Sequence, residues 1–373
     1  MDGSSPRSRT LIWALASVVA LFLVIVGVAV ALILPARSHT EASPTSSVTE
    51  AALPSGPRWV EVSTPDFPGV ADAVAVSDEA LVVSTAKGLY AGLIDEGGVG
   101  VPIQLPVSGG KVGSPTVDGT LVAWWEGTFD KTSNVYVDQA IYAMRLPDGS
   151  PVQVVGYDRA PYYPQLSDGY LAWIQPAPES GAANGDVWIQ PVYRVPVADD
   201  GSPRGEPDLL TSAPRAYVLG SAAWAYSFDG SLLAWEQHQE AEGLGAGVYL
   251  MDLTTGDTTQ VSLSGGRPSI AGNIVTYFGD ALEGMDVAAK KVWTIDTRGD
   301  WATASEDFVV YLRGVRRQDY REVVALRFGD HSEQILGRQT THPSVAAPFA
   351  ASGSHIAYVG DDGKVKLFEW RTG

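Results

Sequence analysis

The stretch Ser227–Gln237, "SFDGSLLAWEQ", decides the fold, because it joins a short polar turn to an apolar run that ends in Trp235. Asp-Gly is typical turn chemistry, since both residues tolerate the left-handed backbone conformation. The apolar and aromatic run after it is typical of a buried strand. We therefore expect Asp229 and Gly230 to make a bend, Trp235 to pack inside the protein, and Glu236 to meet solvent.

The same pattern recurs along the chain. "TVDGTLVAWWEG" (residues 116–127) and "LSDGYLAWIQ" (residues 166–175) are close copies, and four looser copies bring the total to seven. The equivalent positions are Ser84, Trp124, Trp173, Trp235, Tyr277, Tyr311 and Tyr358. Their separations run from 34 to 62 residues, around the ~40 to 50 residues of a propeller blade. The sequence predicts an all-β propeller of seven blades, with six or eight left open.

A second pattern completes most units. "VYLMDLTTGDTTQVS" (residues 248–262) reads as a strand, a turn and an outer strand, the second half of a blade. The last unit has no outer strand after Trp370, whereas residues 58–64, "RWVEVST", form a strand-like run with no blade before it. The first strand is therefore expected to complete the last blade, which would remove an exposed sheet edge.

This repeat, of the form D-G-x-x-L-A-W followed by V-Y-L-M-D-L-x-x-G, resembles the TolB-like, PD40-type propeller repeat and is similar to WD40 blades. The resemblance covers residues 70–373 as a recurring repeat spacing. It is sharpest in the units that begin near Lys111, Ala160 and Ala216. It implies a binding platform, or a propeller that accompanies an enzyme domain.

The amino-terminal region predicts a membrane anchor. Residues 11–34 form a 24-residue run without a charge, which as a helix is about 36 Å long and exceeds a hydrocarbon core of roughly 30 Å. Arg7 and Arg9 precede it, so residues 1–10 are expected to be a short cytoplasmic tail. Residues 35–57 are rich in Ser, Thr, Pro and Ala and read as a flexible linker to an extracytoplasmic propeller at residues 58–373. Cleavage after Ala36 is the alternative.

Composition narrows the partners and the chemistry. The chain of 373 residues has a net charge of −18, which argues against nucleic acid as a partner. It contains no cysteine, so disulfides, zinc–thiolate sites and thiol nucleophiles are excluded. No G-x-S-x-G motif is present, so we expect no hydrolase of the kind that accompanies related propellers.

Neither a catalytic site nor a metal or cofactor site is predicted. Five histidines, without metal-ligand spacing, are expected to have surface or packing roles: His39, His238, His331, His342 and His355. Acidic pairs such as Asp199 with Asp200 and Asp361 with Asp362 lie beside glycine and are interpreted as turn residues. The buried tryptophans are expected to pack between blades.

One basic cluster stands out in the segment "YLRGVRRQDYREV" (residues 311–323). The candidate contacts for a partner or an anion are Arg313, Arg316, Arg317, Tyr320 and Arg321. They are expected in a loop between strands, where pairing with nearby acids is the alternative to binding.

The sequence favours a membrane-anchored, non-catalytic platform that binds a protein or a cell-envelope ligand. The alternative is a carbohydrate-active hydrolase or lyase of the envelope, which needs carboxylates or histidines from several blades at one mouth of the central channel. A sensor domain for another membrane protein also fits the predicted tether.

Overall fold

The structure, a computed structural model, describes residues 56–132, 135–156, 161–175, 188–189, 191–211, 215–216, 226–237, 246–340 and 349–372. The predicted tail and anchor, and the linker up to residue 55, lie outside these residues. No helix long and apolar enough to span a membrane is found in the part of the chain that the structure describes.

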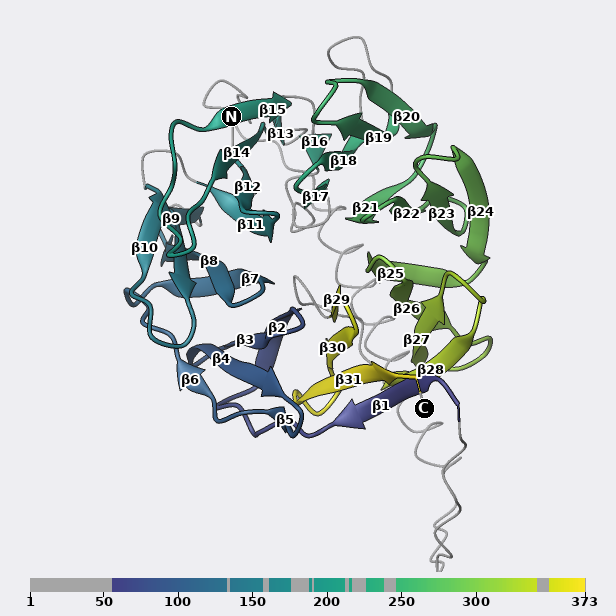
Figure 1. Cartoon of the computed structure of the whole chain (residues 1–373), viewed down its shortest axis with the longest axis horizontal. Helices are drawn as coiled ribbons and strands as arrows, with labels where there is room; N and C mark the ends of the chain where they lie inside the picture. The colour runs from purple at the N-terminus through teal and green to yellow at the C-terminus, as the bar shows by residue number, and fades with distance from the viewer. Residues whose placement is uncertain are drawn as a thin grey trace, which may run out of the picture. The chain divides into compact units, whose positions relative to one another are not determined.

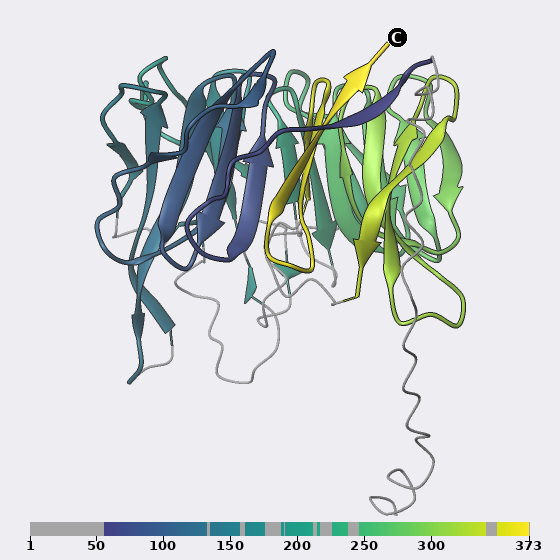
Figure 2. The ribbon, with the colours of Figure 1, turned by 90° about the horizontal axis from the view of Figure 1, so that it is seen from below.

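Seven sheets, almost entirely antiparallel, stand around a central channel, so the predicted seven-bladed propeller is confirmed (Figure 1). We number the blades in chain order. In the side view the strands run between two opposite faces of the ring (Figure 2).

The first four blades hold strands β2 to β20. Blade 1 contains β2 (Ala71–Val76), β3 (Ala80–Thr85), β4 (Gly88–Asp95), β5 (Gly98–Val99) and β6 (Ile103–Gln104). Blade 2 contains β7 (Lys111–Asp118), β8 (Leu121–Asp130), β9 (Val135–Arg145) and β10 (Val152–Val155). Blade 3 contains β11 (Tyr162–Ser167), β12 (Tyr170–Ile174), β14 (Val192–Pro196) and β15 (Asp208–Thr211). Blade 4 contains β17 (Tyr226–Asp229), β18 (Leu232–Gln237), β19 (Gly247–Asp252) and β20 (Thr258–Ser262), with the short β13 (Trp188–Ile189) and β16 (Arg215–Ala216) added.

The remaining blades are regular four-stranded sheets. Blade 5 contains β21 (Gly266–Ala271), β22 (Ile274–Phe278), β23 (Leu282–Asp286) and β24 (Lys291–Asp296). Blade 6 contains β25 (Gly299–Ala304), β26 (Phe308–Gly314), β27 (Arg321–Arg327) and β28 (Glu333–Gln339). Blade 7 contains β29 (Phe349–Ser352), β30 (His355–Val359) and β31 (Val365–Arg371), and β1 (Arg58–Val62) completes it.

The opening stretch forms the first hairpin of blade 4. Asp229 pairs with Leu232 across the turn, and Gly230 has a φ of 49°, a conformation that glycine adopts without steric cost. A Cβ atom at Gly230 would lie 2.5 Å from an Asp168 carboxylate oxygen, so the neighbouring turn of blade 3 packs directly against it. The predicted bend is confirmed, and glycine is required there for two reasons.

The large aromatic residue, present in every repeat except the first, packs against the blade before it. Trp124 joins a core cluster with Val82 and Leu89 of blade 1, and Trp235 joins one with Ile174 of blade 3. Trp124, Trp173 and Trp235 are at most 1% exposed, so the predicted packing between blades is confirmed. Burial of one such side chain contributes several kcal/mol, about 3–5 by the usual cost of its truncation.

Strand β1 closes the ring as predicted. It pairs antiparallel with β31, from Arg58 opposite Arg371 to Val62 opposite Leu367. The centre of the Trp59 ring lies 4.4 Å from the centre of the Phe308 ring in blade 6. The Trp59 backbone N–H also donates to Gln334 Oε1 of blade 6 at 2.8 Å. The first described strand therefore holds two blades at once.

Candidate functional site at the central channel

The innermost strand of each blade lines the central channel. The cavity between these strands has a volume of about 560 Å³, and residues from all seven blades line it. Most of them are small, apolar or hydroxyl-bearing, among them Ala75, Thr116, Ser167, Ser227, Ala271 and Ala302. Three carboxylic acids are also in the lining: Asp78, Asp229 and Glu306.

These acids belong to the first turns of blades 1, 4 and 6. The first turns of neighbouring blades lie close together. A Cβ atom at Gly353 of blade 7 would clash with the Asp78 carboxylate, and one at Gly272 of blade 5 would contact the Glu306 side chain. The innermost strands therefore end at the same mouth of the channel, here called the turn mouth. Carboxylates from three blades therefore line the same cavity.

A circle of hydrogen bonds links neighbouring blades around the channel. In four of the blades a polar side chain two residues before the end of the innermost strand makes the link. In these four links the side-chain oxygen accepts a hydrogen bond from a backbone N–H of the next blade, at 2.7–3.1 Å. The pairs are Thr116 with Leu166, Gln165 with Phe228, Ser227 with Ile270, and Ser269 with Ala304. The other links are Ser305 Oγ to Gly353 O, Ser354 N to Asp78 Oδ1 and Ser77 Oγ to Gly119 O, at 2.7–3.3 Å. Every junction between blades is thus bridged at the channel wall.

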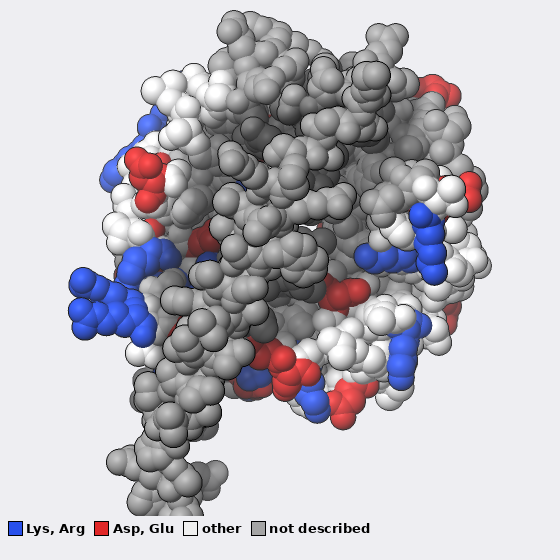
Figure 3. Space-filling model, turned by 180° about the vertical axis from the view of Figure 1, so that it is seen from behind, with Lys and Arg blue, Asp and Glu red and all other residues white. Residues whose placement is uncertain are grey.

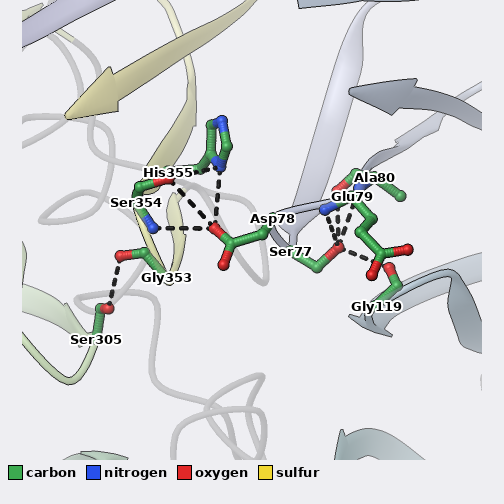
Figure 4. Close-up of polar contacts among 9 residues, drawn as sticks. All are labelled: Ser77, Asp78, Glu79, Ala80, Gly119, Ser305, Gly353, Ser354 and His355. Carbon is green, nitrogen blue, oxygen red and sulfur yellow. Dashed lines mark hydrogen bonds and ion pairs between the residues drawn. The ribbon is translucent and has the colours of Figure 1, made fainter. Parts of the chain in front are cut away.

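The junction between blades 7 and 1 holds a Ser–His–Asp cluster (Figure 4). His355 Nδ1 lies 3.2 Å from Asp78 Oδ1, and Ser354 Oγ lies 3.4 Å from the same nitrogen. The His355 side chain is 8% exposed, whereas Asp78 is largely open to solvent. The cluster is therefore anchored on the buried side of the seam and accessible on the other.

This cluster is not arranged as a catalytic triad. In a triad the histidine contacts the serine through one ring nitrogen and the carboxylate through the other, so that a proton can pass between them. Here both Ser354 and Asp78 approach Nδ1. The geometry joins two blades and provides no relay to the serine.

Asp229 has an altered acidity. Burial raises the pKa of its carboxyl group; a hydrogen bond from the backbone of Gly272 opposes this, and the neighbouring Asp168 carboxylate adds to the rise. Raised pKa values occur both in catalytic acids and in structural clusters of like charges. This change alone does not distinguish the two roles.

The opposite end of the channel is built from β-bulges. Ser114, Tyr163, Arg267 and Trp301 have φ values of 48°, 51°, 54° and 50°, and the strand register shifts at the same places. Bulges re-aim side chains where a strand must bend. Ser114 and Tyr163 take part in the channel lining there.

Glu236, which was expected to meet solvent, is partly buried and also has a structural contact. Its Oε2 accepts a hydrogen bond of 3.0 Å from the backbone N–H of Arg267, and it lies against Gly266. It therefore caps the bulge at the start of the next innermost strand. A carboxylate in this place satisfies a backbone donor that the bulge leaves outside the regular ladder.

The structure separates the predicted basic cluster into two parts. Arg313 lies in β26, not in a loop, and pairs with Glu322 at 3.0 Å and with Asp296 at 3.7 Å. Burial opposes its charge, but hydrogen bonds with Glu333 and Glu322 outweigh this and raise the pKa of Arg313. Arg321 lies 3.4 Å from Asp300. These two arginines are engaged with acids of the propeller itself.

The other members of the cluster lie on the surface. Arg316 and Arg317 are exposed between β26 and β27. The Arg338 guanidinium lies 4.7 Å from the centre of the Tyr320 ring, and Arg338 is also exposed. On the face seen in Figure 3, Lys and Arg side chains form separate groups near the rim. Of the predicted contact residues, Arg316 and Arg317 are thus the exposed arginines, and Tyr320 lies against Arg338.

Metal ligands were not predicted, and no group of three or more acidic or histidine residues suited to a metal occurs in the described parts of the chain. Of the five histidines, His39, His238 and His342 lie outside those parts. His331 is exposed between β27 and β28, and His355 belongs to the seam described above.

The circle of blade links and the Asp78–His355 contact were not predicted from the sequence. A signal for the first was present, since Thr116, Gln165, Ser227 and Ser269 occupy the same place in four repeats. The second joins residues 277 positions apart. Only the closed ring brings them together.

No protein-family model matches this sequence, and neither does any curated protein. Many solved structures are similar to this chain. An oligogalacturonate lyase in complex with manganese aligns with a TM-score of 0.52 at 10% identity, over 86% of this chain and 98% of the lyase. TolB from Acinetobacter baumannii aligns with a TM-score of 0.42 at 11% identity, over 80% and 78% of the two chains.

A puromycin-hydrolysing peptidase from Mycobacterium tuberculosis is also similar, with a TM-score of 0.48 at 15% identity. The alignment covers 76% of this chain but only 45% of the peptidase. TolB proteins are thus among the similar structures, and the ring has the architecture that the TolB-like resemblance implied. At these identities the likenesses describe the fold and not the chemistry.

Proposed function

We propose that this β-propeller is a non-catalytic platform of the cell envelope that binds a protein partner. The observation that carries the proposal is the circle of hydrogen bonds at the channel wall. It uses polar side chains from the lining, including the Asp78 carboxylate, to join blades. A ring fixed in this way presents a rigid surface, and rigidity lowers the entropic cost of binding.

The exposed pair Arg316 and Arg317 is our candidate partner contact. On a protein with a net charge of −18, two adjacent arginines are a local site of opposite sign that suits an acidic patch. Their neighbours Arg313 and Arg321 are paired within the propeller, so they position the loop and leave the contact to the exposed pair.

The test is affinity capture of partners in the native membrane. In the variant, Arg316→Gln is combined with Arg317→Asn, because Arg317 has a φ of 65°, which asparagine tolerates. Lys290→Asn with Lys291→Gln is the matched control, since it removes the same charge and Lys290 also has a positive φ, of 51°. We expect about tenfold less captured partner for the arginine variant only. Equal capture by both variants would remove this loop from the proposal.

We further propose that residues 11–34 anchor the chain with its propeller outside the cytoplasm, with residues 35–57 as the tether. The uncharged 24-residue run and the preceding arginines support this. Added protease should digest the propeller in intact cells while a cytoplasmic control protein survives. Protection of residues 58–373 until the cells are lysed would contradict the orientation.

An envelope enzyme is the second candidate. The observation in its favour is the presence of Asp78, Asp229 and Glu306 in one lining. Two carboxylic acids suffice for glycoside hydrolysis when they flank the scissile bond. This candidate requires an envelope glycan whose breakdown depends on these three residues.

A further inference from the structure

The hydrogen bonds that join the blades follow two patterns around the channel. From blade 2 to blade 6 they run between innermost strands, where a backbone N–H donates to a side-chain oxygen of the blade before. From blade 6 round to blade 2 they lie in the first turns instead, as Figure 4 shows for Ser305, Asp78 and Ser77. In the described part of the chain, β29, β2 and β7, which are neighbours on one side of the channel (Figure 1), receive no link from the strand before them.

Alanine accounts for this difference in two of the blades. The linking residue stands two positions before the residue that closes the first turn, as Ser227 does before Asp229. Thr303 holds this place in blade 6, Ala350 holds it in blade 7 and Ala75 holds it in blade 1. A methyl group makes no hydrogen bond, so each alanine leaves the next innermost strand without a side-chain oxygen.

Two backbone N–H groups face the channel next to these alanines. Val76 lies one residue before Ser77, whose N–H donates to Ala80 O in the pair that closes the turn. Because hydrogen-bonded and non-hydrogen-bonded pairs alternate in an antiparallel ladder, Val76 directs its N–H and C=O away from the sheet. Val117 stands before Asp118 in the same way. In blades 3 to 6 the corresponding N–H groups are the ones that the linking side chains bind.

No residue that the structure describes is a hydrogen-bond partner of these two N–H groups. Val76 is 4% exposed and Val117 is 9% exposed, and both line the channel cavity. A buried N–H that makes no hydrogen bond is costly, because it has lost its contact with water. An oxygen atom from outside the chain is therefore needed where the other blades use threonine, glutamine or serine.

The cavity beside these N–H groups also offers an acceptor and an apolar wall. Asp78 Oδ1 accepts from Ser354 N at 3.0 Å and lies 3.2 Å from His355 Nδ1. Among the described residues, Asp78 Oδ2 has no hydrogen-bond partner. Ala75 and Ala350 belong to the same lining, and no described lysine, arginine or histidine does.

We infer that this part of the channel binds a neutral sugar. A hydroxyl group both donates and accepts hydrogen bonds, so sugar hydroxyls accept from the N–H groups of Val76 and Val117 while another donates to Asp78. The carbon atoms of the sugar pack on the alanine methyl groups. The cavity of about 560 Å³ has the size of a small-molecule site, roughly 300–1,000 Å³. This site is separate from the partner contact proposed above and does not rest on it.

Other classes of ligand satisfy fewer of these groups. An anion would meet the carboxylates of Asp78, Asp229 and Glu306 in a lining without a described cation. An ammonium group only donates, so it would leave both N–H groups unpaired. An extended peptide pairs along one strand edge, whereas Val76 and Val117 belong to different blades. A sugar ring carries hydroxyls on several sides and can reach both.

The test restores the missing side chains. Ala75→Ser with Ala350→Ser places hydroxyl groups where Ser227 and Ser269 carry them, so that they accept from the two N–H groups in place of the ligand. Ala271→Ser is the matched control, because Ala271 lines the same cavity and serine holds the equivalent place in blades 3 and 7. Saturation-transfer NMR detects binding of cellobiose, lactose and maltose, and calorimetry measures the Kd.

We expect at least one disaccharide to bind the parent and the control alike, and the double variant about tenfold more weakly or less. The melting temperature of the double variant should equal or exceed that of the parent, because its hydroxyl groups satisfy two buried donors. Failure of all three sugars to bind, equal binding by the double variant, or a lower melting temperature of that variant overturns the proposal.

Three further probes represent the rejected classes of ligand: cellobionate, spermidine and N-acetyl-trialanine amide. Tighter binding of any of them than of the sugars also overturns the proposal. Conversion of a bound sugar would contradict the non-catalytic platform and not this site. Loss of partner capture from native membranes is likewise a result about the platform alone.

Discussion

At the residue scale, Asp229 shows how one turn residue can bear two roles. It ends an innermost strand, as its Asp-Gly sequence predicts, and it also lines the channel. Burial and the nearby Asp168 raise its pKa, so its ionised form is less favourable in the folded protein than in the unfolded chain. The contribution of Asp229 to stability therefore falls as pH rises from the ordinary aspartate pKa, about 3.9, through the raised pKa of the folded state.

Asp229→Asn should therefore stabilise the protein near neutral pH. The amide oxygen can still accept from Gly272, and the unfavourable charge beside Asp168 is gone. The gain in melting temperature over the parent should be largest at pH 7 and should vanish below about pH 3, where the carboxyl group of the parent is protonated in both the folded and the unfolded state. Thermal melts of the parent and the variant across this pH range measure the difference. A variant less stable than the parent at pH 7 would show that the Asp229 charge is favourable in the folded protein.

At the element scale, the hairpins could be predicted and their lateral contacts could not. The turn residues and the aromatic position in each second strand are local, so "SFDGSLLAWEQ" predicts its hairpin directly. The bulge that Glu236 caps belongs to the next blade, 31 residues away, and no periodicity within either segment indicates it. The short strands β13 and β16 have two residues each, which is too few for a period.

Strand β1 offers the sharpest test at this scale. Trp59→Ala should lower the free energy of unfolding by about 3–5 kcal/mol, because the ring is 4% exposed and packs on blade 6. Leu263→Ala, at a site 81% exposed, should change it by less than about 0.5 kcal/mol. Denaturant titrations give both values. Equal stabilities would mean that closure by β1 contributes little to the ring.

At the scale of the whole molecule, closure links the chain ends to the candidate site. The pairing of β1 with β31 and the Asp78–His355 contact both join the last blade to the first part of the chain. The seven repeats predicted seven blades, with six or eight left open, but the identity of the residues at the turn mouth required the ring. For the same reason the sequence could name Asp229 as a turn residue and could not place it in one cavity with Asp78 and Glu306.

The central claim is that the propeller binds and does not transform its ligand. The most direct measurement is quantitative capture from native membranes by the parent and by a folded variant with Asp78→Asn, Asp229→Asn and Glu306→Gln. We predict the same protein partners at the same yield for both. A polysaccharide retained by the variant alone, as a substrate is held by a disabled enzyme, would contradict the claim.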